Sequence, residues 1–285
     1  MNPAPTPLPA FLGIGALKAG TTYLDSLLRD HPGLSFPTHL KEADYFSRHH
    51  PRGEQWYAGL FAPDDGRLRG EISPQYVSHP EAPDRVLAAN PEVRLLVSVR
   101  HPVDRVVSQY RHWVQETGYR GDLATFLSEH PNAVDRSRYA RDLRAWVDRF
   151  GAAAIHLVDL DDLRTDPART ARTAAEFLGV ATPDTWQPTT TGETNASVAP
   201  RFPRAYAAAK AVSRRLTATG HAGVVDRVKS SAPARALKRG RQGVTAAPVP
   251  DAILADLGAA LADEADRLTE LLDRPVGTSW RAPTA

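Results

Sequence analysis

Blocks of apolar residues alternate along this 285-residue chain with segments of mixed polarity. Val93 to Arg100, VRLLVSVR, is a near-continuous apolar run of the kind that buried parallel strands contain. Ala10 to Ala16 and Ala153 to Leu163 are further apolar runs, which we interpret as buried strands. Leu34 to Ser47 begins as a short strand and enters a turn, and Gly70 to Val77 has the pattern of a strand interrupted by a proline.

Between these runs, apolar side chains recur every three or four residues, which is the period of an amphipathic helix. The helix that begins at His101 and Pro102 has proline in its first turn, where proline is well tolerated. The helices expected are Thr21 to Asp30, residues 82–90, the segment from His101, Ser137 to Phe150, Asp166 to Val180 and Ile253 to Leu272. Strands that alternate with helices predict a three-layer α/β fold, with a central parallel sheet and helices on both faces.

The length of the chain permits one large domain, and we expect residues 1–285 to form it. Residues 10–180 would supply the α/β core. Residues 181–285 would supply a polar loop and a helical C-terminal part, because the strand pattern ends there.

The composition excludes several classes of site. The chain has no cysteine, so disulfides, thiolate metal sites and cysteine nucleophiles are excluded. It has neither a basic leader nor an apolar run long enough to span a membrane, and we expect a cytoplasmic protein.

The net charge of +2 does not indicate a nucleic-acid partner, although Arg201 to Arg241 contains eleven Lys or Arg and one acid. We interpret this basic segment as a solvated helical face and expect no nucleic-acid partner. Binding to nucleic acid or to an anionic surface is the alternative.

The segment GALKAGTTYL follows the first strand and leads into the first helix. Backbone N–H groups of such a glycine turn bind phosphate oxygens, helped by the positive end of the helix dipole. Gly15 and Gly20 keep the spacing of a nucleotide-triphosphate loop and Thr22 keeps its final hydroxyl, but Thr21 occupies the lysine position and Lys18 lies between the glycines. Glycines needed only for packing are the alternative explanation.

A second element supports phosphate binding. In VSVRHPVDRVVSQY, Arg100 ends a core strand and Ser108 lies two turns into the next helix. Open α/β sheets bind ligands at the carboxyl ends of their strands, and a guanidinium suits a phosphate dianion. A surface ion pair is the alternative for Arg100.

Together these segments resemble the sulfotransferases that use 3′-phosphoadenosine 5′-phosphosulfate (PAPS), especially the heparan-type and related bacterial branch of the P-loop-like sulfotransferases. GALKAGTTYL resembles their 5′-phosphosulfate loop, and VSVRHPVDRVVSQY resembles their 3′-phosphate element. The likeness continues in PTHLKEADYFS, GEISPQYVSHPEAPDRV, SRYARDLRAWVDRF and HLVDLDDLRTDPARTARTAAEFLGV. It implies the P-loop-NTPase-like sulfotransferase fold, PAPS as sulfuryl donor and adenosine 3′,5′-bisphosphate (PAP) as product.

The resemblance also implies roles for single residues. Donor contacts are expected from Ala16, Lys18, Ala19, Gly20, Thr21 and Thr22 in the loop, and from Arg100, Ser108 and Arg201. Lys18 would stabilise the negative charge that grows on the bridging oxygen. Glu42 would take the proton of the acceptor substrate, with His39 as the alternative base. A solvated turn is the alternative explanation for Lys41 and Glu42. No metal is required.

Departures from the family pattern concern the acceptor substrate. Asp44 and Ser47 stand where heparan-type relatives often have histidine and aspartate, and Ile72 stands where lysine is common in enzymes that act on sulfated glycans. We therefore expect a small-molecule or carbohydrate acceptor, sulfated on a hydroxyl, or with less support an amine, of a sugar-containing or secondary metabolite. A P-loop kinase or NTPase with Asp159 near magnesium is the main alternative. The sequence does not indicate the oligomeric state, and a homodimer is one possibility.

Overall fold

The computed structural model describes residues 9–188, 212, 246–276 and 280. Two compact units divide the chain: the first comprises Met1–Arg105, Arg136–Thr194 and Leu261–Ala285, and the second comprises Val106–Asp135 and Asn195–Ala260. Arg201 and, apart from Val212, the basic segment lie outside the described residues. The expectation of a single domain stays a prediction.

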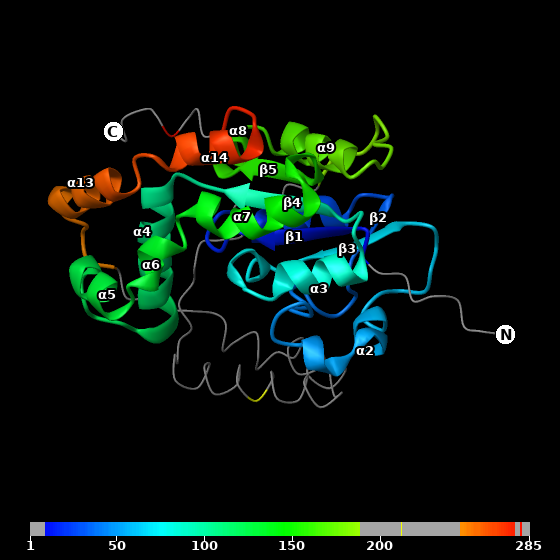
Figure 1. Ribbon diagram of the computed structural model, residues 1–285, viewed down its shortest axis with the longest axis horizontal. Coiled ribbons are helices and arrows are strands. Elements are labelled where there is room, and N and C mark those ends of the chain that lie inside the picture. The colour runs from blue at the N-terminus through cyan, green and yellow to red at the C-terminus, as the bar shows by residue number, and fades with distance from the viewer. Residues whose placement is uncertain (1–8, 189–211, 213–245, 277–279, 281–285) are drawn as a thin grey trace. The chain divides into compact units, whose positions relative to one another are not determined.

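The first unit contains a five-stranded sheet, shown in Figure 1. Its strands are β1 (Phe11–Gly15), β2 (Leu34–Ser35), β3 (Leu68–Ile72), β4 (Arg94–Val99) and β5 (Ile155–Asp159), in the order β2-β3-β1-β4-β5. Every neighbouring pair is parallel. The predicted parallel sheet is confirmed. Because all strands run in the same direction, the segments that follow them begin at the same edge of the sheet.

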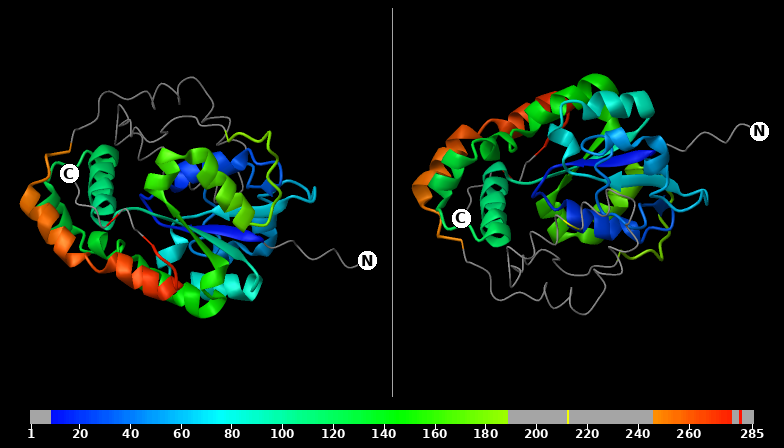
Figure 2. Two further views of the ribbon diagram at one scale, coloured as in Figure 1. Left: turned by 90° about the horizontal axis from the view of Figure 1, so that it is seen from above. Right: turned by 90° about the horizontal axis from the view of Figure 1, so that it is seen from below.

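Helices cover both faces of this sheet, as predicted. One face carries α1 (Thr21–Arg29), α8 (Leu160–Thr165) and α9 (Pro167–Phe177), and the other carries α3 (Ala82–Ala89), α7 (Tyr139–Phe150) and α14 (Glu264–Leu272). Figure 2 shows α9 and α14 on opposite sides of the strands. Each face has its own buried cluster: Leu24 and Leu27 of α1 belong to one, and Trp146 of α7 belongs to the other.

Two predicted elements were wrong in extent. The strand predicted from Ala153 to Leu163 ends at Asp159, because that side chain accepts the N–H of Asp161 at 2.9 Å and caps α8. The single helix predicted from Ile253 to Leu272 is two helices, α13 (Asp251–Ala260) and α14. Apolar spacing continues through the turn between them, so periodicity alone did not reveal the break.

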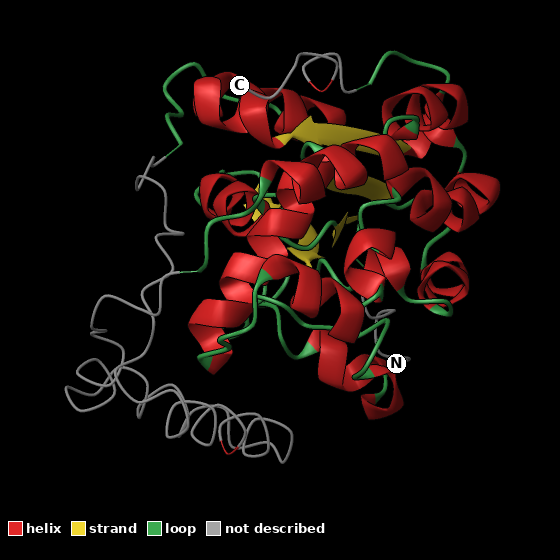
Figure 3. Cartoon of the chain, turned by 90° about the vertical axis from the view of Figure 1, so that its left-hand side faces the viewer, coloured by secondary structure: helices red, strands yellow, loops and turns green. Residues whose placement is uncertain are grey.

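The described part of the second unit consists of helices and loops (Figure 3). Helix α4 (Pro102–Thr117) begins at the proline that the sequence indicated and continues into this unit, which also holds α5 (Leu123–Glu129), α6 (Asn132–Asp135) and α13. In this unit the ring of Tyr110 packs against that of Phe126, with 5.6 Å between the ring centroids. Within the described residues, no helix combines the length and apolarity needed to cross a membrane.

Candidate functional site

The glycine turn between β1 and α1 has the backbone of an anion-binding loop. Gly20 precedes the helix in the left-handed region, with φ 86° and ψ 11°. A Cβ at this position would lie 2.5 Å from Cδ1 of Leu160, so a larger residue would disturb both the turn and α8. Thr21 and Thr22 begin α1, and their backbone N–H groups precede the first bonds of the helix, which the Tyr23 and Leu24 N–H groups make to the Gly20 carbonyl at 2.9 and 3.0 Å. The N–H groups of Thr21 and Thr22 suit a phosphate or sulfate oxygen.

Lys18 also has a left-handed backbone, with φ 70°, which is uncommon for a residue with a side chain. Such strained positions cluster at binding and catalytic sites. The loop around it is attached to β4, because the Ala16 N–H donates to the Ser98 carbonyl at 2.7 Å. Ala19 is buried, and its N–H donates to the Ala16 carbonyl at 3.3 Å. The Ala16 N–H is therefore already engaged within the fold.

Lys41, for which no role was predicted, joins Thr22 of α1 to the predicted base, Glu42. Nζ of Lys41 lies 2.9 Å from Oγ1 of Thr22 and 2.9 Å from Oε1 of Glu42. The Lys41 and Glu42 side chains are 33% and 35% exposed, so both can meet a ligand. The sequence of Lys41 and Glu42 does not indicate the contact between Lys41 and Thr22, because that contact forms only when the fold brings residues 22 and 41 together.

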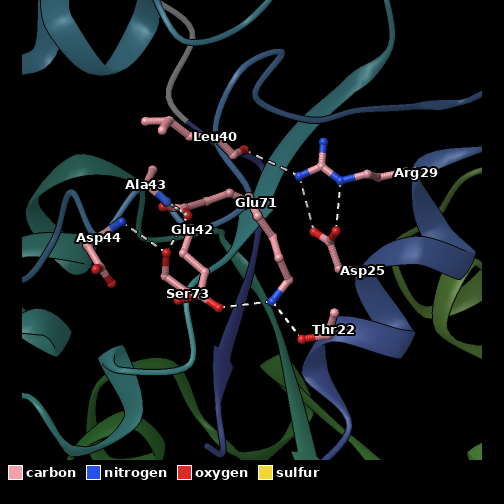
Figure 4. Close-up of polar contacts among 10 residues, drawn as sticks. Thr22, Asp25, Arg29, Leu40, Glu42, Ala43, Asp44, Glu71 and Ser73 are labelled. Atoms are coloured by element: carbon pink, nitrogen blue, oxygen red, sulfur yellow. Dashed lines mark hydrogen bonds and ion pairs between the residues drawn. The ribbon is translucent and has the colours of Figure 1, made fainter. Parts of the chain in front are cut away.

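The segment before Lys41 is attached to α1 through Arg29. Its guanidinium binds Asp25 with 2.7 Å between Nε and Oδ2, and it donates to the carbonyls of Pro37 at 3.0 Å and Leu40 at 3.4 Å. Burial raises the pKa of Asp25, while Arg29 lowers it. The helix that presents Thr22 therefore also supports the chain that leads to Glu42 (Figure 4).

Behind Glu42, a fully buried carboxyl group, that of Glu71 on β3, binds the same segment. Its Oε2 accepts the Ala43 N–H at 3.0 Å and the Ser73 hydroxyl at 2.6 Å, and its Oε1 accepts the Tyr76 hydroxyl at 2.5 Å. Burial raises the pKa of Glu71 to about 7, although these hydrogen bonds oppose the shift. Glu71 was not predicted as a site residue, since one acid in an apolar strand carries no chemical signature.

The residues that depart from the family pattern are mostly buried. Asp44 pairs with Arg48 at 2.9 Å, and its Oδ1 is buried without a partner among the described residues. Burial raises the pKa of Asp44, and Arg48 opposes this. Ile72 and Ser47 are buried, whereas His39 is exposed. Ile72 therefore does not offer its side chain to a ligand.

Arg100 follows β4 at the edge where the loop begins. Its carbonyl accepts the Tyr139 hydroxyl at 3.0 Å, and Nη2 lies 3.5 Å from Oδ2 of Asp104. Nε of Arg100 is buried and has no partner among the described residues, which fits a site for a phosphate oxygen. Ser108 is half-buried on α4 within the second unit, and its predicted role stays a prediction, as does that of Arg201. Arg100 follows β4 and α1 follows β1, which are neighbouring parallel strands, so both offer hydrogen-bond donors at the same edge of the sheet.

Metal ligands do not cluster in the described part of the chain: no three His, Asp or Glu side chains there are grouped to hold an ion. Asp159, which the kinase alternative would assign to magnesium, caps α8 instead.

Comparison with known proteins agrees with this geometry. A family model described as "Sulfotransferase family" matches residues 42–184. Heparan sulfate glucosamine 3-O-sulfotransferase 6 of Mus musculus is 31% identical over 181 residues, which are 60% of this chain and 52% of that protein. The membrane-associated sulfotransferase kil1 of Dictyostelium discoideum is 35% identical over 112 residues, or 38% of this chain and 24% of that protein. The chain thus spans about half the length of the heparan sulfate 3-O-sulfotransferases that it matches.

The fold has a close counterpart among solved structures. A sulfotransferase from Alicyclobacillus acidocaldarius superposes with a TM-score of 0.68 at 24% identity, covering 96% of this chain and 99% of that one. These similarities support a transferase and do not favour the kinase alternative. The chain belongs to the sulfotransferase family.

Proposed function

We propose that this sulfotransferase transfers a sulfuryl group from PAPS to a hydroxyl group of a sugar-containing or secondary-metabolite acceptor, with release of PAP. The observation that carries the proposal is the contact of Lys41 with both Thr22 and Glu42. It brings a candidate base beside the helix N-terminus that suits an anion. A donor group bound by the first turn of α1 would therefore lie within reach of a carboxylate.

Donor binding is assigned to groups whose hydrogen-bonding capacity the fold leaves open. The backbone N–H groups and the hydroxyls of Thr21 and Thr22 would hold the 5′-phosphosulfate. The buried Nε of Arg100 would bind the 3′-phosphate by a charge-assisted hydrogen bond.

Two groups would carry the chemistry. When bound, PAPS supplies the sulfuryl group and a bridging oxygen that gains negative charge as its bond to sulfur breaks. Lys18, held in the loop with a left-handed backbone, would stabilise that charge. Glu42 would accept the proton of the attacking hydroxyl, and its contact with Lys41 would orient it.

Ile72 stands where a lysine is common in enzymes that act on sulfated glycans, and on this departure we infer an acceptor with little negative charge. Asp44 does not decide this, because it is buried and paired with Arg48. A carbohydrate hydroxyl is supported by the similarity to proteins named heparan sulfate glucosamine 3-O-sulfotransferases. An amine has less support, because the relative whose name includes an N-sulfotransferase is 27% identical.

Thermal-shift measurements with PAP and with ATP test the donor. PAP should raise the unfolding temperature with increasing concentration, since a ligand that binds only the folded state stabilises it. Equal stabilisation by ATP, or none by PAP, would contradict the assignment. Mass spectrometry of candidate acceptors incubated with enzyme and PAPS should then show the gain of one SO₃ group, and Glu42→Gln should abolish this gain while PAP still binds.

A further inference from the structure

Glu71 has an unusual set of partners, because the groups that reach its carboxyl are hydrogen-bond donors. Ala43 N–H and Ser73 Oγ–H meet Oε2, and the hydroxyl of Tyr76 meets Oε1, with that of Tyr57 3.5 Å away. Burial and the neighbouring Glu71 raise the pKa of both tyrosines well above its usual value, so both keep their protons. A carboxylate can accept all of these bonds.

A neutral carboxyl group fits the same surroundings less well. Its own proton needs an acceptor, and the Ala43 N–H cannot serve as one. Ser73 Oγ already accepts the Asp44 N–H at 3.0 Å, and the Tyr76 oxygen already receives the Phe46 N–H at 3.3 Å. These hydroxyl oxygens can each accept a second hydrogen bond, but protonation of Glu71 would turn its charge-assisted bonds into neutral ones, which are roughly half as strong. It would therefore weaken the bonds that hold the chain after Glu42.

These bonds hold one short segment. Ala43 is bound directly by Glu71, Asp44 through Ser73, and Phe46 through Tyr76. All three groups are backbone N–H donors in the residues after Glu42, and none belongs to a helix or strand. The position of the Glu42 backbone thus depends on side chains of β3 and of the residues after it (Figure 4).

We propose that Glu71 is a positioning residue for sulfuryl transfer: while ionised, it fixes residues 42–46 at the edge of the sheet, and on protonation it releases them. The consequence for turnover rests on the proposed role of Glu42 as base. The positioning itself does not.

The electrostatic surroundings place this change near neutral pH. Burial raises the pKa of Glu71 to about 7, and the carboxylate of Asp44 adds to the increase. Tyr57 of α2 (Glu54–Ala58) and Tyr76 face Glu71 as neutral donors. Segment 42–46 should therefore become looser as pH falls below about 7.

Residue-resolved amide hydrogen exchange by NMR on the full chain, without donor, tests this directly. The variants are Glu71→Gln and two controls, Asp44→Asn and the matched Glu264→Gln. Glu264 is also buried, also has a pKa raised to about 7 by burial, and also binds a backbone N–H, that of Ala140 at 2.6 Å, but it has no bond to segment 42–46.

Exchange rates are first corrected for intrinsic base catalysis. In the wild type, protection of the Ala43 and Asp44 amides should fall by up to about tenfold per pH unit below neutrality, following the ionised fraction of Glu71. Glu71→Gln should remove this pH dependence, since an amide does not titrate, and it should show the lower protection expected of the neutral carboxyl group. Asp44→Asn and Glu264→Gln should retain it.

Three outcomes would overturn the proposal. One is wild-type protection at Ala43 that is constant from about pH 5.5 to about pH 8.5, after the correction. Another is loss of the pH dependence in Asp44→Asn, which would identify Asp44 as the titrating group. The last is a loss of amide protection in Glu71→Gln that is as large in β1 and β4 as in segment 42–46, which would indicate a general structural role. Because no donor is present, failure of PAP to bind would refute the proposed function and leave this test intact.

Once sulfuryl transfer to an acceptor is detected, the pH dependence of turnover provides a second measurement. kcat of the wild type should fall on acidification with an inflection near pH 7, which Glu71→Gln should lack, whereas PAP affinity should not follow this profile. An unchanged inflection in Glu71→Gln would also count against the proposal.

Discussion

Replacing Glu71 with glutamine should make the protein more stable at alkaline pH even though it impairs the candidate site. The pKa of Glu71 is about 7 in the folded protein and 4.5 is its ordinary value. Between these values the folded state keeps a proton that the unfolded state releases, so stability falls as pH rises from 4.5 to 7. Above pH 7 the full cost of the buried charge is present, and glutamine removes it.

The size of the effect follows from the two pKa values. Their separation, from 4.5 to about 7, at about 1.36 kcal/mol per pH unit, corresponds to about 3 kcal/mol. Glutamine resembles the neutral carboxyl group, since its oxygen can accept the Ala43 N–H and its uncharged NH₂ group can donate to a tyrosine oxygen. The variant and the wild type should therefore be equally stable near pH 4.5 and differ by up to about 3 kcal/mol above pH 7.

Urea denaturation of both proteins at about pH 5 and about pH 8.5 measures this difference directly. Glu264→Gln, assayed alongside, should show a gain with the same sign, because the pKa of Glu264 is also raised to about 7. A Glu71→Gln difference that is the same at both pH values would refute the reasoning, since it would show that Glu71 does not change its protonation between folded and unfolded states in this range.

Substitutions in the candidate site should separate binding from chemistry. Lys18→Ala should lower kcat by about 100-fold or more with a smaller change in PAP affinity, measured by steady-state kinetics and calorimetry; equal losses in both would contradict its transition-state role. Arg100→Ala should weaken PAP binding by about 10- to 100-fold, as loss of a charged hydrogen bond predicts, and unchanged affinity would exclude it from the phosphate site. Lys41→Met, which keeps length without charge, should lower kcat by about tenfold or more while Lys41→Arg retains part of it; wild-type turnover in Lys41→Met would show that the contact with Glu42 has no catalytic importance.

Much of the fold could be predicted because its signals are local. VRLLVSVR is long and apolar enough to identify β4, and the spacing of Leu24, Leu27 and Leu28 identifies α1. The errors concern the points at which elements end. Asp159 caps α8 inside an otherwise apolar run, and the turn before Glu264 interrupts a helical pattern without changing its period.

The candidate site was only partly predictable. The loop glycines and Lys18 are adjacent in sequence, so their spacing indicated their chemistry. The contacts of Lys41 with Thr22 and of Glu71 with Ala43 join residues 19 and 28 positions apart, and only the folded chain brings them together. A lone carboxyl in a strand and a lysine in a turn have no local pattern that distinguishes them from ordinary residues.

The Arg29 contact has a consequence for engineering this enzyme. One guanidinium ties α1 to the carbonyls of Pro37 and Leu40, so the helix at the proposed donor site and the approach to the proposed base form one mechanical unit. Directed evolution toward a new acceptor substrate should leave Asp25, Arg29 and residues 37–42 unchanged. Libraries that randomise these positions would change donor geometry together with acceptor selectivity, and improvements in one would be confounded with losses in the other.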